Sequence, residues 1–329
     1  MRRLILVLPV LAALVAAGCG GASDTNDATA AGGGPSAGKQ TLSLVAYSTP
    51  QVAYDQVIPA FQKTSAGKGV GFKTSYGPSG DQSRAVDSGL KADVVTFSLE
   101  PDLDRLIKDG QVAKSAANRW VTTSVVTFIV RKGNPKHIRT WDDLLRPGVQ
   151  VVTPNPFTSG AAKWNLLAAY GAKGLPFVKT LLTQHVKVQP KSGRDALQTF
   201  TQGEGDVLIS YENEAITAQK KGQDVDYVIP SQTIKIENPI AVTSKAPAAA
   251  KAFVDYALSK PAQQVFASWG YRPVDPSVLA ANKAKFPTPS GLFTIDKVGG
   301  WSKVNDSLFD PDKGAIAKIE QQAGVSTAK

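Results

Sequence analysis

Few residues of this chain can build disulfide, metal or acid–base sites. Its 329 residues include one cysteine, Cys19, and two histidines, His137 and His185. A single cysteine excludes an internal disulfide framework and a four-cysteine zinc site. The histidines form no HExxH pair and lie near no nucleophile in the sequence, and residues 77–80 do not make a GxSxG elbow. We therefore expect no metal, no cofactor and no enzyme activity.

Large apolar side chains are missing from residues 20–40, which contain no aromatic residue and no Val, Ile, Leu or Met. Such a segment cannot bury a core, so residues 19–40 are predicted to form a flexible tether. Before it, residues 2 and 3 are arginines and residues 4–17 are an apolar run too short to span a bilayer. Residues 1–18 are therefore predicted to be a signal peptide, with Cys19 placed for lipid modification. An ordinary cleaved signal is the alternative.

Long runs of positive charge are missing as well. There are 37 Lys and Arg against 27 Asp and Glu, a formal net charge of +10, but no five consecutive basic residues. Nucleic acid is therefore a poor candidate partner. The excess charge suits weak attraction of anions and equally suits solubility. The hydrophobic fraction of 42% is typical of a folded globular protein, and a chain of this length is expected to form about two domains.

From residue 41 onward, predicted strands alternate with predicted helices. Strands are expected at residues 42–47, 72–76, 93–97, 121–131, 149–153, 186–189 and 207–211. Helices are expected at residues 50–62, 102–108, 161–170, 195–201, 213–221, 248–258, 261–269 and 313–322. This alternation predicts an α/β fold with mostly parallel sheets, in which ligands bind beyond the carboxyl ends of the strands.

Four turns between a strand and a helix share one composition. They lie at residues 47–50, 77–80, 158–161 and 192–195, and each places Ser, Thr or Gly at a helix start. The free backbone N–H groups there carry the positive end of the helix dipole, which makes them a site for anions. The alternative for each turn is a plain N-cap, and the turns alone do not identify the ligand.

Several longer motifs indicate a family. The sequence TPNPFTSGAAKWN at residues 153–165 resembles the signature of the bacterial sulfate-binding proteins of ABC importers. The sequences VRKGNPK at residues 130–136 and GDVLISYENEA at residues 205–215 resemble the same family, and the similarity covers residues 41–305. The resemblance implies a monomer that binds sulfate outside the cytoplasm and delivers it to a permease and ATPase. Thiosulfate, molybdate and phosphate are alternative ligands.

The resemblance also implies the architecture. The family has an α/β, two-lobed periplasmic-binding-protein fold of type II, a Venus flytrap, with two crossovers expected near residues 125–131 and 236–242. One lobe is expected from residues 41–125 and 238–275, and the other from residues 126–237 and 276–329. With Cys19 lipidated, the protein would be anchored at the outer face of the membrane, or lie in a periplasm.

In this family the ligand lies between the lobes and is held by neutral donors. Matched by position, the resemblance assigns ligand binding to Ser48, Ser79, Ser159, Gly160, Ala161, Gly193 and Tyr211, and a supporting role to Arg194. Two residues depart from the family: Ser48 replaces a common Asp, and Tyr211 replaces a Trp whose indole N–H donates to the anion. A phenol oxygen accepts as well as donates, so the resemblance leaves the geometry at Tyr211 open.

One carboxylate could contradict the choice of sulfate. Asp81 lies two positions after Ser79, at the same helix start. If its side chain faced the ligand, it would accept the proton of phosphate and repel sulfate. We expect instead that Asp81 complements the helix dipole from outside the site.

Overall fold

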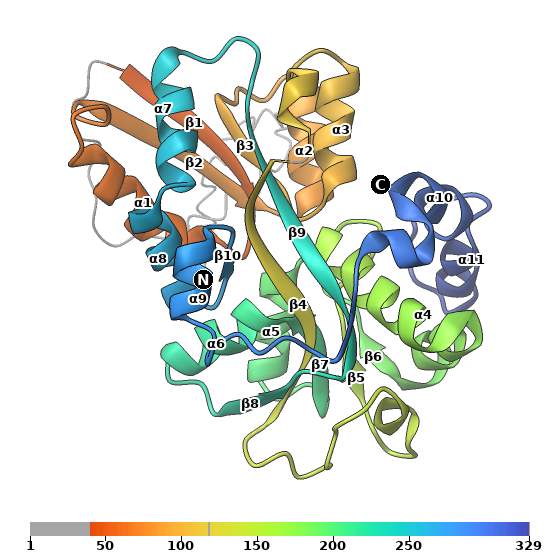
Figure 1. Cartoon of the computed structure of the whole chain (residues 1–329). Helices are drawn as coiled ribbons and strands as arrows, with labels where there is room; N and C mark the ends of the chain where they lie inside the picture. The colour runs from red at the N-terminus through yellow and green to blue at the C-terminus, as the bar shows by residue number, and fades with distance from the viewer. Residues whose placement is uncertain (1–39, 118, 329) are drawn as a thin grey trace, which may run out of the picture. The chain divides into compact units, whose positions relative to one another are not determined.

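The computed structural model describes residues 40–117 and 119–328. The predicted signal peptide, Cys19 and all of the predicted tether except Gln40 lie outside these residues. In the described part the strands and helices form two lobes, which Figure 1 shows above and below one another.

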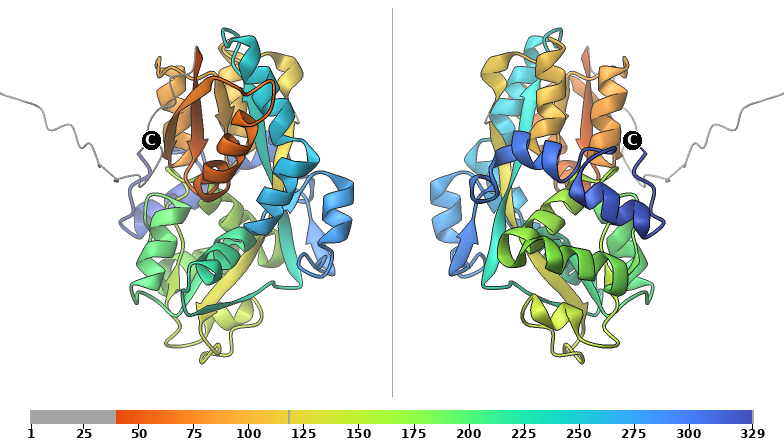
Figure 2. Two further views of the ribbon diagram at one scale, coloured as in Figure 1. Left: turned by 90° about the vertical axis from the view of Figure 1, so that its left-hand side faces the viewer. Right: turned by 90° about the vertical axis from the view of Figure 1, so that its right-hand side faces the viewer.

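The first lobe is built on three parallel strands, β1 (Gln40–Tyr47), β2 (Val70–Gly77) and β3 (Val94–Thr96). Its helices are α1 (Gln51–Gln62), α2 (Ser79–Asp87), α3 (Glu100–Lys108), α7 (Ala248–Ala257) and α8 (Lys260–Ser268). Side chains alternate between the two faces of a strand. Leu42 and Leu44 therefore pack with α1, α7 and α8, while Val45 packs with α2 and α3 on the other face. Figure 2 shows helices on both faces of these strands.

Two long strands, β4 (Trp120–Arg131) and β9 (Gln232–Val242), connect the lobes. They pair with each other in antiparallel fashion, while β9 also pairs with β3 and β4 continues into the second lobe (Figure 1). β4 is rich in Val, Thr and Ile, whose branched side chains favour extended backbone. The crossovers expected from the sequence fall on these two strands. The short strands β10 (Arg272–Pro273) and β11 (Gly291–Phe293) pair with β4 and β9.

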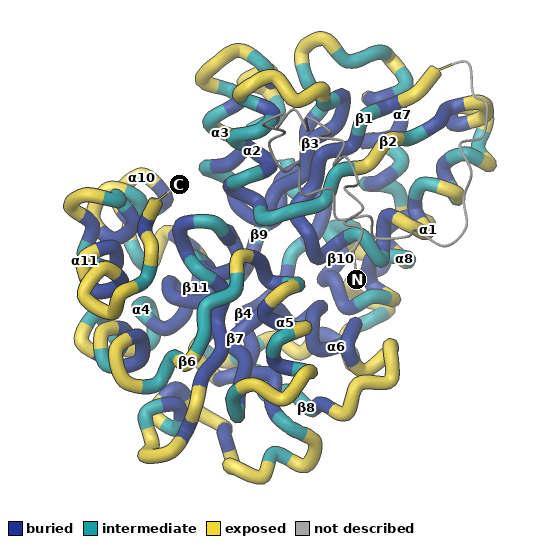
Figure 3. The backbone as a smooth tube through the Cα atoms, turned by 180° about the vertical axis from the view of Figure 1, so that it is seen from behind, coloured by how far each residue is buried: buried dark blue, intermediate teal, exposed yellow. Residues whose placement is uncertain are grey.

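The second lobe has a parallel set of strands, β5 (Val151–Val152), β6 (Val186–Val188) and β7 (Val207–Tyr211). β4 pairs with β7 in antiparallel fashion, and β8 (Val225–Val228) pairs with β4, also antiparallel. Its helices are α4 (Gly160–Thr180), α5 (Gly193–Thr201), α6 (Glu212–Lys220), α10 (Gly300–Ser307) and α11 (Ala315–Gln322). Trp164 of α4 and Trp301 of α10 meet edge-to-face in its core, with ring centroids 4.7 Å apart. Figure 3 shows the strands buried beneath helices whose outer sides are exposed.

The remaining elements are short. They are α9 (Pro276–Ala281), the 3-10 turns Lys114–Ala116, Asp142–Leu145 and Ile295–Val298, and a π-helical turn, Leu181–His185. The exact residues at which the chain divides between lobes, 41–125 with 238–275 and 126–237 with 276–329, stay a prediction.

The sequence pattern misplaced or missed several elements. α4 begins one residue before the predicted helix and runs past its end to Thr180, because a second helical segment follows Gly174, whose φ of 81° breaks the first. The start of α2 was predicted from the turn at residues 77–80, whereas α10 and β8 had no clear periodic signal. β9 was predicted only as a crossover near residues 236–242, and its first part, in which Ile234 and Ile236 are buried in the core of the second lobe, was missed.

Candidate functional site

A small cavity lies where the four serine- and glycine-rich turns meet. Six of the residues predicted to bind ligand line it: Ser48, Ser79, Ser159, Gly160, Ala161 and Gly193. Five others complete the lining: Tyr47, Thr49, Pro78, Ser98 and Ser192. The cavity volume is about 10 Å³, close to what one water molecule needs, so in this closed form it excludes an organic ligand.

Four helices begin at this cavity. Ser79 and Gly160 are the first residues of α2 and α4, Gly193 is the first residue of α5, and Thr49 lies just before α1. A helix start leaves its first amide groups without intrahelical acceptors and carries about half a positive charge. Four such ends together act like about two positive charges, although no side chain of the lining is ionised.

Gly160 is required by packing across the two lobes. A methyl group added at Gly160 would lie 2.7 Å from both the Ser98 hydroxyl oxygen and a Leu99 methyl carbon. The start of α4 therefore approaches the turn after β3 more closely than any side chain allows. Gly193 differs, since an added methyl group would meet Thr49 and Ala161 at 3.4 and 3.5 Å, which are ordinary contact distances.

The hydroxyl of Ser79 is occupied within the protein. It donates to Asp102 Oδ2 at 2.6 Å and accepts from the Ser98 amide at 2.9 Å. Burial raises the pKa of Asp102, and the Ser79 hydrogen bond opposes that rise. Ser79 therefore offers the cavity its backbone amide and not its hydroxyl. Asp102 was not predicted from the sequence, because nothing in a sequence shows from which hydroxyl a carboxylate 23 residues away will accept a hydrogen bond.

Tyr211 is not part of the cavity lining. Its hydroxyl lies 2.7 Å from the hydroxyl oxygen of Ser98, which does line the cavity. Burial raises the pKa of Tyr211 far above its ordinary value. Ser98 was not predicted as a site residue, although Ser98 directly follows the predicted strand at residues 93–97 and so occupies a fifth turn between a strand and a helix.

Arg194 lies behind the cavity and bridges the lobes. Its guanidinium donates to the Ser48 carbonyl oxygen and to Gln51 Oε1. It also lines a neighbouring pocket of about 350 Å³ together with Asp55, Glu214 and Lys221. Glu214 is buried, and burial raises its pKa to about 7.

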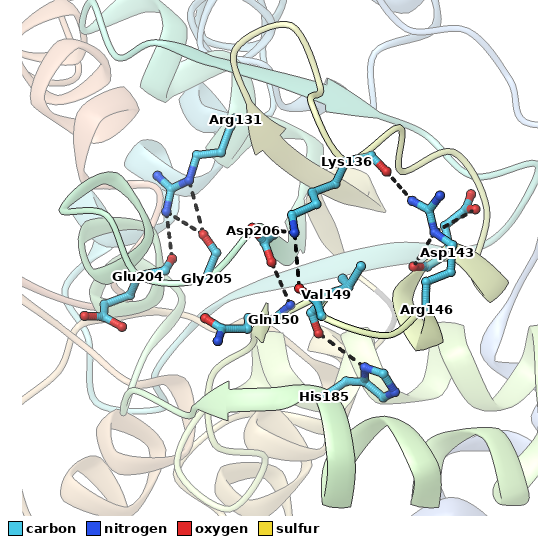
Figure 4. Close-up of polar contacts among 11 residues, drawn as sticks. Arg131, Lys136, Asp143, Arg146, Val149, Gln150, His185, Glu204, Gly205 and Asp206 are labelled. Carbon is cyan, nitrogen blue, oxygen red and sulfur yellow. Dashed lines mark hydrogen bonds and ion pairs between the residues drawn. The ribbon is translucent and has the colours of Figure 1, made fainter.

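Other charged or titratable residues of interest are engaged elsewhere. Asp81 pairs with Arg84, and its half-exposed side chain does not line the cavity. Glu212 forms a buried ion pair with Arg272 at 2.6 Å. His185 Nδ1 lies 3.2 Å from the Val149 carbonyl oxygen, in a network at the far end of the second lobe (Figure 4).

Nearby, Arg131 donates to the carbonyl oxygens of Glu204 and Gly205 in the turn after α5 (Figure 4) and to that of Phe200 in α5. The contacts are structural and distant from the cavity lining. Among residues 40–117 and 119–328, no group of three or more His, Cys, Asp or Glu could hold a metal ion.

Comparison with known proteins decides the family. The family profile described as bacterial extracellular solute-binding protein matches residues 42–272. A sulfate-binding protein of Synechococcus elongatus is 40% identical, over 93% of this chain and 92% of its own. The chain belongs to the sulfate- and thiosulfate-binding proteins, a family of extracellular solute-binding proteins and not of enzymes. The family predicted from the sequence motifs is confirmed.

Two further proteins similar to this chain support the same assignment. The solved structure of the sulfate-binding protein SubI from Mycobacterium tuberculosis has 50% identity and a TM-score of 0.79, covering 82% of this chain and all of that one. A thiosulfate-binding protein of Pseudomonas aeruginosa is 37% identical, over 84% of this chain and 91% of its own. The predicted two-lobed periplasmic-binding-protein fold is confirmed by these matches. No helix in the described part of the chain is long and apolar enough to cross a membrane.

Proposed function

We propose that this protein is the extracytoplasmic sulfate-binding component of an ABC importer. The observation that supports it best is the lining of the cavity, which contains only backbone groups and neutral side chains. A fully ionised dianion needs donors on all sides and no acceptor, because it has no proton to give. Four helix starts, together worth about two positive charges, match that requirement.

Each lining group has a role in this proposal. The backbone amides of Ser48, Ser79, Gly160, Ala161 and Gly193 donate to the anion, and so does the hydroxyl of Ser159. Ser159 precedes α4, but its side chain makes no capping hydrogen bond to the helix, so capping does not engage its hydroxyl. Arg194 supports the turn that carries Ser48 by donating to the Ser48 carbonyl oxygen, and does not itself line the cavity.

Binding is coupled to closure of the lobes. In the structure the Trp164 indole N–H of the second lobe donates to the Ser98 carbonyl oxygen of the first lobe at 2.8 Å. Together with the contacts of Arg194, this bond holds the two lobes together over the cavity. An anion that meets amides from both lobes stabilises the closed state over an open one. The closed protein then presents sulfate to the permease and its ATPase, as a monomer anchored through Cys19 to the outer face of the membrane.

Thiosulfate is the main alternative ligand, because it is also a dianion without a proton and one close relative is named for it. Molybdate shares that chemistry but is larger. Phosphate fits least well, since it keeps a proton near neutral pH, no carboxylate lines the cavity, and the buried carboxylate of Asp102 already accepts from Ser79. Asp81 faces Arg84 and not the cavity.

Titration calorimetry of the purified protein with sulfate, thiosulfate, molybdate and phosphate tests the proposal. We expect sulfate to bind, thiosulfate to compete with it, and phosphate to bind weakly at every pH between about 5 and 8. Tight phosphate binding, or no response to any of the four anions, would contradict the proposed function.

A further inference from the structure

Ser98 and Tyr211 come from opposite lobes and share a hydrogen bond beside the cavity. Ser98 follows β3 and is 1% exposed, whereas Tyr211 ends β7 and is fully buried. Their hydroxyl oxygens are 2.7 Å apart, and either could donate. Each hydroxyl carries one proton, and only one of the two protons can lie in the bond between them.

The surroundings of the pair decide the direction of the bond. Among residues 40–117 and 119–328, neither hydroxyl has another hydrogen-bond partner. If Ser98 donated to Tyr211, the Tyr211 proton would be buried without an acceptor, which is costly. When Tyr211 donates to Ser98, every proton on the Tyr211 side is satisfied and the Ser98 proton remains for the cavity. We infer that Tyr211 orients Ser98 as an obligate hydrogen-bond donor to a deprotonated oxygen of the bound anion.

The location of Ser98 fits this role. Its hydroxyl oxygen lies beside the start of α4, 2.7 Å from where a methyl group on Gly160 would be, so it is next to the first amides of that helix. The rest of Ser98 is held in place, because its amide donates to Ser79 Oγ at 2.9 Å and its carbonyl oxygen accepts from Asn238 at 2.9 Å and from Trp164. These bonds fix the backbone of Ser98, and the bond to Tyr211 restricts the rotation of its side chain and hydroxyl.

Selectivity between anions follows from this one-way bond. Sulfate and thiosulfate present only acceptors to Ser98, whereas hydrogen phosphate also presents a P–OH group. If Ser98 can only donate, it forms a hydrogen bond with any oxygen of sulfate, whereas the P–OH group of phosphate finds no acceptor at Ser98. Ser98 is therefore a direct specificity residue, and Tyr211 is a positioning residue that acts through it. This inference rests on the proposed function, because it assumes that the anion enters this cavity.

Calorimetry of four variants with sulfate and with inorganic phosphate tests the inference. Ser98→Ala should weaken sulfate binding by about 10- to 100-fold, as expected for a lost bond to a buried charge. Tyr211→Phe should weaken it by roughly 2- to 10-fold and should also lower the ratio of sulfate to phosphate affinity, because the Ser98 hydroxyl is then free to turn and accept. The double variant should match Ser98→Ala alone, since Tyr211 acts only through Ser98.

Tyr54→Phe is the matched control. Tyr54 is a fully buried tyrosine of the first lobe that does not line the cavity, so its variant should keep both affinities. If the losses multiply in the double variant, Tyr211 contacts the anion itself and the inference is wrong. It is equally wrong if Ser98→Ala binds sulfate as the wild type does, or if Tyr211→Phe keeps the wild-type ratio. A wild-type protein that binds no sulfate, thiosulfate or molybdate overturns the proposed function and this inference together.

Discussion

Replacing Gly160 by alanine should weaken anion binding much more than the same change at Gly193. Both glycines line the cavity and both begin a helix of the second lobe. The added methyl group at Gly160 would lie 2.7 Å from the Ser98 hydroxyl oxygen and 2.8 Å from its Cβ, so the start of α4 or the turn after β3 must move. At Gly193 the nearest atom would be 3.4 Å away, and nothing has to move.

The expected magnitude follows from where the clash occurs. Ser98 and Leu99 belong to the first lobe and Gly160 to the second, so the added methyl group disfavours the closed state and leaves each separate lobe unstrained. Overpacking of this kind costs about 1–3 kcal/mol. That cost appears in full as lost binding free energy, which corresponds to a dissociation constant for sulfate that is roughly 5- to 150-fold larger.

Calorimetric titration with sulfate measures the two dissociation constants, and urea denaturation of the ligand-free variants measures their stability. We expect Gly193→Ala to stay within about 3-fold of the wild-type affinity, and both ligand-free variants to unfold at nearly the wild-type urea concentration. Equal affinities for Gly160→Ala and Gly193→Ala would refute the reasoning, because the two sites would then be equally tolerant of the closed packing. Unfolding of Gly160→Ala at much lower urea concentration would place the strain inside one lobe.

Three further predictions follow. Ser159→Ala should weaken sulfate binding by roughly 1–3 kcal/mol, measured by calorimetry, if its hydroxyl bonds a buried anion; an unchanged affinity would remove this hydroxyl from the site. Burial raises the pKa of Glu214 from 4.5 to about 7, so the neutral form is favoured in the folded protein. The stability that this gives is fully present below about pH 4.5 and is lost as pH rises to about 7, by about 3 kcal/mol. Glu214→Gln should flatten that part of the pH dependence of urea denaturation, and an unaltered curve would show that Glu214 ionises freely in the folded state. Cys19→Ser should release the protein from the membrane fraction, and continued fractionation with membranes would contradict the lipid anchor.

Much of the fold and part of the site could be predicted from residues close together in the sequence. Alternating strands and helices predicted the α/β class, and parallel strands bring their following turns to one edge of a sheet. That rule is why Ser48 and Ser79 of the first lobe, and Ser159 and Gly193 of the second, share one cavity. The motif around Ser159 and Gly160, together with several other motifs in the same order, indicated the family.

The roles of individual hydroxyl groups were decided by the tertiary structure alone. Ser79 and Ser159 look alike in the sequence, yet the Ser79 hydroxyl is engaged by Asp102, while Ser159 does not cap its helix through its side chain. Tyr211 was expected to meet the ligand, but its hydroxyl meets Ser98, which is 113 residues away in the chain. Whether a hydrogen bond forms depends on differences of a few tenths of an ångström in the distance between atoms far apart in the sequence, and local sequence patterns contain no such information. The sequence by itself therefore determined the fold class, the family and four of the five turns that form the cavity, whereas only packing within and between the lobes decided which of their donors remain free to face an anion.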